Sequence, residues 1–248
     1  MKQVYLFLVF LIMAVYGSAQ TDAITTSKGI LEIHPVYHGS FWMNWNSVHI
    51  AVDPYGGAER YKEMGKANLI LITDIHGDHL DSSTLVNLDL VNTVLVAPKA
   101  VKERLTKFLP KDQKILELAN GDSLEWNGIR VHAIPMYNLP DTAGSRHPRG
   151  RGNGYVLTMG GKRIYISGDT EDIPEMRNLE KIDIAFLCMN KPYTMDIQQA
   201  ASAALAFRPV VVYPFHFRQP GGFSDVKEFA RLVMEGNTGI EVRLRSWY

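Results

Sequence analysis

The sequence predicts a layered α/β fold. Its 248 residues suffice for one large domain, and short apolar runs alternate with helical patterns along both halves of the chain. Polar residues of metal-binding types follow several of these apolar runs. No internal repeat or low-complexity linker divides the chain. This alternation is typical of strands flanked by helices, with a site at the carboxyl ends of the strands.

The N-terminal residues have the pattern of a secretory signal peptide. Lys2 precedes an apolar run, and Gly17-Ser18-Ala19 supplies small residues before a cut after Ala19. The run is too short to cross a bilayer as a mature helix, and no later run is long and apolar enough to do so. We therefore expect residues 1–19 to be removed and residues 20–248 to form one exported domain, periplasmic or secreted, without a stable membrane anchor. An uncleaved N-terminal anchor is the alternative.

The first half of this domain reads as strands, followed by an alternation of strands and helices. Short apolar runs predict buried strands, because a strand covered on both faces needs no polar alternation. Asp81 or Ser82 suits a helix N-cap, and Pro98 suits the first position of a helix. The elements expected here are successive strands within 30–54, strands at 69–72 and 94–96, and helices at 80–88 and 98–108.

The second half continues the alternation. Gly160-Gly161 lies between two strand patterns and predicts a two-residue hairpin. The longest irregular stretch, 137–153, contains several prolines and glycines, and loops of this length inside a domain are usually functional or disordered. The elements expected here are strands at 129–134, 155–159, 163–167, 182–187 and 210–213, and helices at 197–207 and 224–235.

Some conspicuous side chains are expected to serve the fold. Phe41, Trp42 and Trp45 are predicted to lie in the core between sheets, where aromatic rings fill space. Three histidines within strand patterns are predicted to be structural, namely His34, His49 and His132.

The composition restricts the chemistry. The 26 basic residues balance 26 acidic ones, which excludes a strongly basic nucleic-acid binder. The single cysteine, Cys188, excludes an internal disulfide and a thiolate metal cluster, and its apolar neighbours predict burial. Any metal site must therefore use histidine and carboxylate ligands. We expect a small-molecule substrate and no nucleic-acid partner, and the sequence leaves the oligomeric state open.

The sharpest motif is Asp74-Ile75-His76-Gly77-Asp78-His79, directly after a predicted buried strand. Neutral imidazole and carboxylate are the ligands that Zn²⁺, Mn²⁺ and Fe²⁺ take in proteins. The alternative is a polar turn in which Asp78 caps the next helix. The density of metal-binding side chains in one turn favours the metal site.

Two later segments are expected to contribute to the same site. Asp169 follows the predicted strand that ends near Ser167, and His216 follows the one that ends near Tyr213. Both residues lie just beyond the carboxyl end of a strand, where α/β folds build their sites. Taken alone, Asp169 would be interpreted as a turn residue and His216 as a core histidine. Together with the motif at 74–79, both are better interpreted as metal ligands.

These motifs resemble those of the metallo-β-lactamase superfamily of metal-dependent hydrolases. Within it, the chain looks nearest to the branch of L-ascorbate-6-phosphate lactonase and N-acyl-phosphatidylethanolamine phospholipase D. The residues that carry the resemblance are Asp74-x-His76-x-Asp78-His79 for the H-x-H-x-D-H motif, Asp53 for a strand-end aspartate, Asp169 for the bridging aspartate, His216 for the last histidine, and His38-Gly39-Ser40-Phe41 for the early motif of the branch. The resemblance spans about residues 30–216 and implies a four-layer αββα sandwich with the site at one edge of the two sheets.

The resemblance also implies two metal sites and one or two divalent ions, with Zn²⁺ preferred and Mn²⁺ or Fe²⁺ as alternatives. The ligands implied for the second site are all present, namely Asp78, His79, Asp169 and His216. The first site retains His76 and Asp169, but Asp74 replaces its first histidine. The third histidine of this site is missing near residues 135–138, and Asn138, Tyr137 or His147 is the candidate substitute. An aspartate at position 74 shifts the preference toward harder ions such as Mn²⁺, Mg²⁺ or Ca²⁺.

The activity implied is hydrolysis of an ester, lactone or phosphodiester by a metal-activated water. Asp78 would bind metal and orient that water, and Asp74 is a candidate general base if only one ion binds. A metal-stabilised binding or sensing protein without turnover is the second hypothesis. A redox or oxygen-handling metalloprotein is a weaker third.

Five further residues are candidates for the surroundings of the site. Arg149 and Arg151 could pair with a phosphate or carboxylate of the substrate, or form a solvated basic loop. Asn190 and Tyr193 follow a predicted strand and could form a pocket wall or a turn with a helix cap. His38 could hold a ligand or a water from behind, or be a core histidine.

Overall fold

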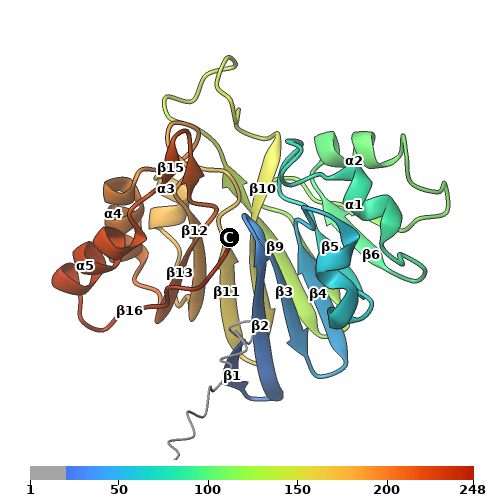
Figure 1. The fold of residues 1–248 in the computed structure, drawn as a ribbon, viewed down its shortest axis with the longest axis horizontal. Helices are drawn as coiled ribbons and strands as arrows, with labels where there is room; N and C mark the ends of the chain where they lie inside the picture. Colours follow the sequence, from blue (N-terminus) through green and yellow to red (C-terminus); the bar gives the residue numbers. More distant parts are fainter. Residues whose placement is uncertain (1–20) are drawn as a thin grey trace, which may run out of the picture.

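Two sheets face each other, and helices cover the outer face of each (Figure 1). The structure is a computed structural model that describes residues 21–248, so the predicted signal peptide lies outside the described residues. The arrangement confirms the predicted four-layer αββα sandwich.

The first sheet has seven strands in the order of the sequence. Strands β1 to β4 run antiparallel, and β4 to β7 are parallel, so β4 to β6 end at the same edge of the sheet. The bounds are β1 Asp22–Thr26, β2 Gly29–Tyr37, β3 Ser40–Trp45, β4 Val48–Val52, β5 Leu69–Leu71, β6 Val94–Ala97 and β7 Ile115–Glu117, with η1 Ala58–Met64, α1 Ser82–Asn87 and α2 Lys99–Leu105.

The second sheet has the order β16-β13-β12-β11-β10-β9-β8. Its strands β11, β12 and β13 are parallel, and β10 and β11 form the hairpin predicted at Gly160-Gly161. The bounds are β8 Ser123–Trp126, β9 Ile129–Met136, β10 Gly152–Met159, β11 Lys162–Ile166, β12 Ile184–Cys188, β13 Val211–Phe215 and β16 Glu241–Val242, with α3 Pro174–Arg177, α4 Ile197–Phe207, α5 Val226–Gly236 and the small hairpin of β14 Arg218–Gln219 and β15 Gly222–Phe223.

The alternation of side chains along β3 divides its aromatic residues between two cores. Phe41 and Trp45 point between the sheets, and the ring of Phe41 stacks on that of Phe186 with 4.0 Å between centroids. Trp42 points the other way and packs beside Tyr61, in the apolar layer between the first sheet and its helices. The prediction for Trp42 is therefore wrong, because neighbouring residues of a strand face opposite sides of the sheet.

Most predicted elements are confirmed, and the differences lie at edges and ends. In the two large sheets, the strands that the sequence does not predict are the outer ones, β1, β7, β8 and β16, which carry partly exposed residues. The short strands β14 and β15 and the helices η1 and α3 are also unpredicted. Helix α2 ends at Leu105 rather than near residue 108, and Pro98 is its N-cap rather than its first residue. Cys188 is buried, as predicted. His34, His49 and His132 lie on β2, β4 and β9 and bond to Asn44, Lys66 and Ser123.

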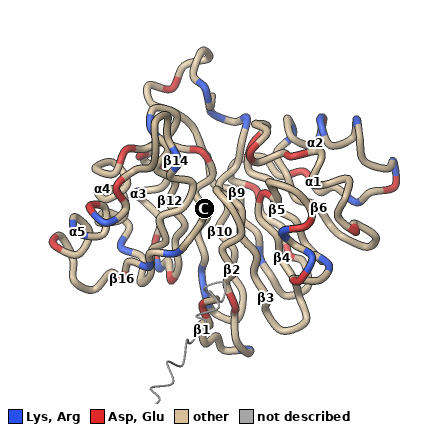
Figure 2. The backbone as a smooth tube through the Cα atoms, viewed as in Figure 1, with Lys and Arg blue, Asp and Glu red and all other residues tan. Residues whose placement is uncertain are grey.

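Lys and Arg are interspersed with Asp and Glu along both halves of the backbone (Figure 2). Among the helices of residues 21–248, none combines the length and the apolar character needed to cross a membrane.

Candidate metal centre

Histidine and aspartate side chains converge where parallel strands of both sheets end. The turn that follows β5 carries the predicted motif, and the segments that follow β11 and β13 carry Asp169 and His216. The loop between β9 and β10, which rises above the sheets at the top of Figure 1, adds His147. The convergent side chains are those of Asp74, His76, Asp78, His79, His147, Asp169 and His216.

One group, the Asp78 cluster, consists of Asp78, His79, Asp169 and His216. Nε2 of His79 lies 3.2 Å from Oδ2 of Asp169 and 3.2 Å from Nε2 of His216. Nε2 of His216 lies 3.3 Å from Oδ2 of Asp78 and 3.5 Å from Oδ1 of Asp169. These are the four residues that the family resemblance implies for the second metal site.

The other group, the Asp74 cluster, consists of Asp74, His76 and His147, and adjoins Asp169. Nδ1 of His76 lies 2.5 Å from Oδ2 of Asp74, and Nε2 of His147 lies 3.1 Å from Oδ2 of Asp169. One ligand-type atom from each member of this cluster falls within 4.8 Å of the others. The carboxylate of Asp169 therefore lies between the two clusters.

Asn138 decides how His147 faces this cluster. The amide nitrogen of Asn138 donates to Glu171 at 3.2 Å and to the carbonyl of Tyr193 at 2.9 Å, which leaves Oδ1 facing His147. That oxygen accepts from the backbone N–H of His147 at 2.8 Å and from its Nδ1 at 3.0 Å. In the neutral ring, Nε2 of His147 is then the nitrogen without a hydrogen, and it lies 3.1 Å from Oδ2 of Asp169. Of the three candidate substitutes, His147 reaches the cluster, Asn138 stands behind it, and Tyr137 turns away to donate to Glu175.

Asp53 orients His79 in a comparable way. Its carboxylate accepts from the backbone N–H of Thr73 at 2.7 Å, from the Thr73 hydroxyl at 2.5 Å and from Nδ1 of His79 at 2.8 Å. Because Nδ1 carries the proton in this bond, Nε2 is the nitrogen that presents a lone pair to the cluster in the neutral ring of His79. The strand-end aspartate at position 53 therefore supports a ligand from behind.

The carboxylates of the site are held in their charged form. Burial alone would raise the pKa of Asp78 and Asp169, but the neighbouring His79 and His216 lower both. Burial also opposes ionisation of Asp74, yet the bond with His76 and the charges of His79 and Arg151 lower its pKa to about 2. The pKa of His79 rises despite burial, because Asp169, Asp53 and Asp78 surround it. Such a concentration of buried negative charge attracts cations.

The donor set fits a divalent metal. Nε2 of His147 and Oδ1 of Asp169 are buried and have no hydrogen-bond partner within residues 21–248. Nε2 of His79, the unprotonated nitrogen of the neutral ring, faces Nε2 of His216 across 3.2 Å. Buried acceptors that face one another are costly unless a cation lies between them. Imidazole nitrogen with carboxylate oxygen suits Zn²⁺, Mn²⁺ or Fe²⁺.

Unusual backbone conformations accompany this geometry. Asp53, His38 and His216 have φ values of 42°, 60° and 47°, in the left-handed region that costs side-chain-bearing residues roughly 1–3 kcal/mol. The backbone N–H of His216 donates to the carbonyl of His38 at 3.1 Å. A Cβ at Gly39 would lie 2.7 Å from Cδ2 of His216, so a glycine is needed there for the histidine ring to pack. The surrounding contacts hold the strained residues in place.

A cavity of about 310 Å³ opens beside Asp78 and Asp169. His38, Asn190 and Tyr193 line it. A place in a pocket wall was predicted for Asn190 and Tyr193, whereas His38 was predicted to hold a ligand or a water from behind. Nε2 of His38 contacts Oδ2 of Asp78 at 3.1 Å. Burial lowers the pKa of His38 to about 4, although Asp78 acts in the opposite direction.

The arginines of the cavity are not the ones predicted. Arg149 pairs with Glu175 and lies over the ring of Tyr137, and Arg151 contacts both oxygens of Asp74 at 3.3 Å. Neither of them lines the cavity, whereas Arg146 and Arg218 do.

Sequence reasoning missed these two arginines, although a signal existed. Each lies within two residues of a cluster histidine, since Arg146 precedes His147 and Arg218 follows His216. The guanidinium of Arg146 lies 4.4 Å from the ring centroid of Tyr193. Neither arginine has a carboxylate partner in the part of the chain that the structure describes.

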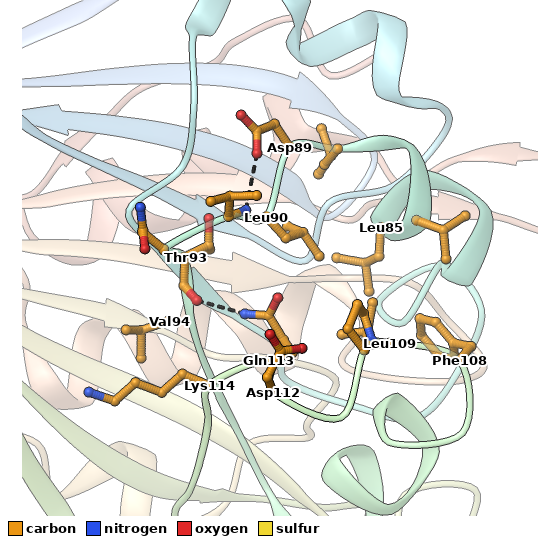
Figure 3. Close-up of a pocket in the computed structure, with 15 residues that line it drawn as sticks. Leu85, Asp89, Leu90, Thr93, Val94, Phe108, Leu109, Asp112, Gln113 and Lys114 are labelled. Carbon is orange, nitrogen blue, oxygen red and sulfur yellow. Dashed lines mark hydrogen bonds between the residues drawn. The ribbon is translucent and has the colours of Figure 1, made fainter.

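A larger hollow of about 830 Å³ lies between α1, β6 and the segment that follows α2 (Figure 3). Its walls include Leu85, Leu90, Phe108 and Leu109, and Gln113 donates to the carbonyl of Thr93 at 2.7 Å. Of the described residues that line it, none is a histidine or a cysteine. The smaller cavity, beside the two clusters, is therefore the candidate active site.

Comparison with known proteins agrees with this site. The family profile of the Beta-lactamase superfamily domain matches residues 32–216. A UPF0173 metal-dependent hydrolase of Thermoplasma acidophilum is 31% identical over 179 residues, which cover 68% of this chain and 75% of the relative.

Two solved structures extend the comparison to the fold. The crystal structure of a proposed metal-dependent hydrolase from Parabacteroides distasonis is 38% identical, with a TM-score of 0.80 over 92% of this chain and 99% of that one. Igni18, a metallo hydrolase from Ignicoccus hospitalis, is 25% identical, with a TM-score of 0.73 over 87% of this chain and 95% of that one.

Proposed function

The chain belongs to the beta-lactamase superfamily and is a metal-dependent hydrolase, and we propose that it cleaves an ester, a lactone or a phosphodiester. The observation that carries this proposal is the position of Asp169, 3.2 Å from His79 of one cluster and 3.1 Å from His147 of the other. One or two divalent ions held there would lower the pKa of a bound water and stabilise developing negative charge. The donor set favours Zn²⁺, with Mn²⁺ or Fe²⁺ as alternatives.

The residues of the site would have different roles in such a reaction. The Asp78 cluster and the Asp74 cluster would each hold one ion and share Asp169. The side chain of Asp78 is 30% exposed and faces the cavity, so it can orient the attacking water and accept its proton. Asp74 is fully buried and paired with Arg151, which favours the role of ligand over that of general base.

The cavity supports a substrate with an anionic group. Arg146 and Arg218 reach it without carboxylate partners among the described residues, and an arginine in that state can bind a phosphate or carboxylate at two points. The stacking of Arg146 on Tyr193 reduces the freedom that binding would otherwise remove. The early motif His38-Gly39-Ser40-Phe41 supports a place near the branch of sugar-phosphate lactonases and phospholipases. Export is proposed from the pattern of residues 1–19, and a mature N-terminus at Gln20 would support it.

Metal content per chain is the first measurement. Elemental analysis of the purified protein without added metal is expected to find two ions, one for each cluster. One ion would restrict the chemistry to the Asp78 cluster, in which Asp53 at a strand end fixes the ring of His79. No ion, even after soaking with Zn²⁺ or Mn²⁺, would overturn the proposed mechanism.

Turnover of simple substrates is the second measurement. We expect cleavage of at least one of p-nitrophenyl acetate, bis(p-nitrophenyl) phosphate and a δ-lactone, and loss of that activity in Asp78→Ala. Asp112→Ala is the matched control, because Asp112 is exposed and lies at the remote hollow. Retention of metal without cleavage of any substrate would favour the alternative, a binding or sensing protein without turnover. The similarity to relatives named as metal-dependent hydrolases argues against that alternative.

A further inference from the structure

Three residues distant in sequence form a hydrogen-bonded chain beside the cavity. The hydroxyl of Tyr248 lies 2.7 Å from Nδ1 of His38, and Nε2 of His38 lies 3.1 Å from Oδ2 of Asp78. His38 follows β2, Asp78 lies in the turn after β5, and Tyr248 is the last residue of the sequence. The tertiary structure alone brings them together.

The groups at the two ends of this series of hydrogen bonds, Asp78 and Tyr248, determine which atom donates in each bond. The carboxylate of Asp78 can only accept, so Nε2 of His38 must carry a hydrogen and donate it. In the neutral ring Nδ1 is then an acceptor, which takes the hydroxyl hydrogen of Tyr248. The backbone N–H of Arg218 donates to the same hydroxyl oxygen at 3.0 Å. Every donor therefore has an acceptor, and a single tautomer of His38 satisfies the whole arrangement.

The phenol of Tyr248 is held from several sides. The neighbouring Trp247 is 1% exposed, and its carbonyl accepts from the backbone N–H of His38 at 3.0 Å. The ring of Tyr248 contacts those of Phe217 and Phe223, with centroids 5.1 and 4.7 Å away. These contacts present the hydroxyl to His38 with little freedom to turn away.

Asp78 is the carboxylate of the site that most needs such support. Its side chain is 30% exposed, whereas those of Asp74 and Asp169 are at most 5% exposed and surrounded by protein. A carboxylate at the mouth of a cavity would rotate among several orientations. The bond from His38 fixes Oδ2 on the side of His216, which lies 3.3 Å away.

We propose that Tyr248 is a positioning residue, which holds the ring of His38 in the tautomer that donates to Asp78 and through it fixes the orientation of Asp78. The inference rests on the proposed function, because it assigns the oriented carboxylate to metal binding and to the attacking water. Removing a hydrogen-bond partner that orients a metal ligand from outside the site typically lowers metal affinity or activity about 10–100-fold.

The test compares Tyr248→Phe with Tyr55→Phe. Tyr55 is a suitable control because its ring lies 5.8 Å from that of His38, while its hydroxyl has no hydrogen-bond partner among the described residues. In Tyr248→Phe we expect Zn²⁺ affinity or kcat to fall about 10–100-fold with KM little changed, and Tyr55→Phe to match the wild type. The ¹⁵N spectrum of His38 is expected to show a proton on Nε2 in the wild type and a mixture of tautomers in Tyr248→Phe.

A double variant separates positioning from a general effect on the fold. His38→Asn keeps a residue that tolerates the left-handed backbone found there, with φ of 60°. If Tyr248 acts through His38, Tyr248→Phe costs nothing further in the His38→Asn background. Losses that simply multiply, or an unchanged His38 spectrum in Tyr248→Phe, would overturn the inference. The spectrum and the Zn²⁺ titration need no turnover, so a protein that cleaves no substrate would defeat the proposed function and still leave this inference testable.

Discussion

The Asp78 cluster and the Asp74 cluster share Asp169 but are built differently. In the Asp78 cluster, His216 directly follows β13, His79 lies in the turn after β5, and Asp53 at the end of β4 fixes the ring of His79. The Asp74 cluster instead takes His147 from the loop between β9 and β10, and Arg151 of the same loop contacts Asp74. Strand ends therefore define one half of the site, and a loop completes the other.

This difference has an electrostatic consequence. Arg151 partly neutralises Asp74, whereas no arginine or lysine among the described residues pairs with a carboxylate of the Asp78 cluster. A cation in the Asp74 cluster competes with the guanidinium for the same oxygens. We therefore expect the Asp78 cluster to bind its ion more tightly, and the predictions below test this ranking from the largest effect to the smallest.

Asp169→Ala is expected to have the largest effect, because this carboxylate serves both halves. Both ions should be lost, and kcat/KM should fall by at least about 10²–10³-fold, as when a main electrostatic group of a site is removed. Elemental analysis and steady-state kinetics provide the measurement, with circular dichroism as the check on folding. Retention of a full complement of metal would show that the clusters do not depend on Asp169.

The pair His147→Asn and His216→Asn separates the two halves. Each variant should lose the ion of its own cluster and retain the other, and asparagine suits the left-handed backbone of His216. We expect His147→Asn to reduce kcat/KM about 10²-fold and His216→Asn to reduce it more. Identical losses of metal and activity in both would contradict the ranking.

Asn138→Ala and Asp53→Asn test the groups that stand behind the histidines. Asn138 receives the N–H of the His147 ring, and Asp53 receives that of His79. Each change should lower the affinity for one ion by about 10–100-fold and leave the affinity for the other nearly unchanged. Competition with a chromophoric chelator measures both affinities in one titration. Equal weakening of both ions by either variant would mean that the halves are not supported independently.

A smaller effect is expected away from both clusters, where Asp22 of β1 contacts Arg245 and Tyr213. Burial opposes the charge of Asp22, but the bonds from Arg245 and Tyr213 lower its pKa below 3.8 in the folded protein. The stabilisation is thus present above the unfolded pKa and is lost as the pH falls through the lower folded value. In urea, Asp22→Asn should lose about 1–2 kcal/mol at neutral pH. The difference from the wild type should shrink in acid, while kcat is unchanged; a constant difference at all pH values would contradict the assignment.

Local pattern was sufficient for much of the fold. Buried parallel strands such as β5, β6 and β12 are predicted by their apolar runs, and the exact range of α4 agrees with its capping residue Asp196. The outer strands were missed because partly exposed residues leave no apolar run. Trp42 was misplaced because an aromatic residue alone does not reveal which face of the strand it occupies.

The sequence by itself determined the motif at 74–79, because these side chains belong to one turn and their order is local. It also predicted that Asp169 and His216 lie beside this motif, since each follows a strand whose neighbours end at the same edge. Only the tertiary structure decided that His147 faces Asp169 with Asn138 behind it, and that Arg146 and Arg218 rather than Arg149 and Arg151 reach the cavity. The same holds for Tyr248 beside His38. The path of a long loop and the meeting of distant segments depend on packing against the rest of the chain, which no local pattern records.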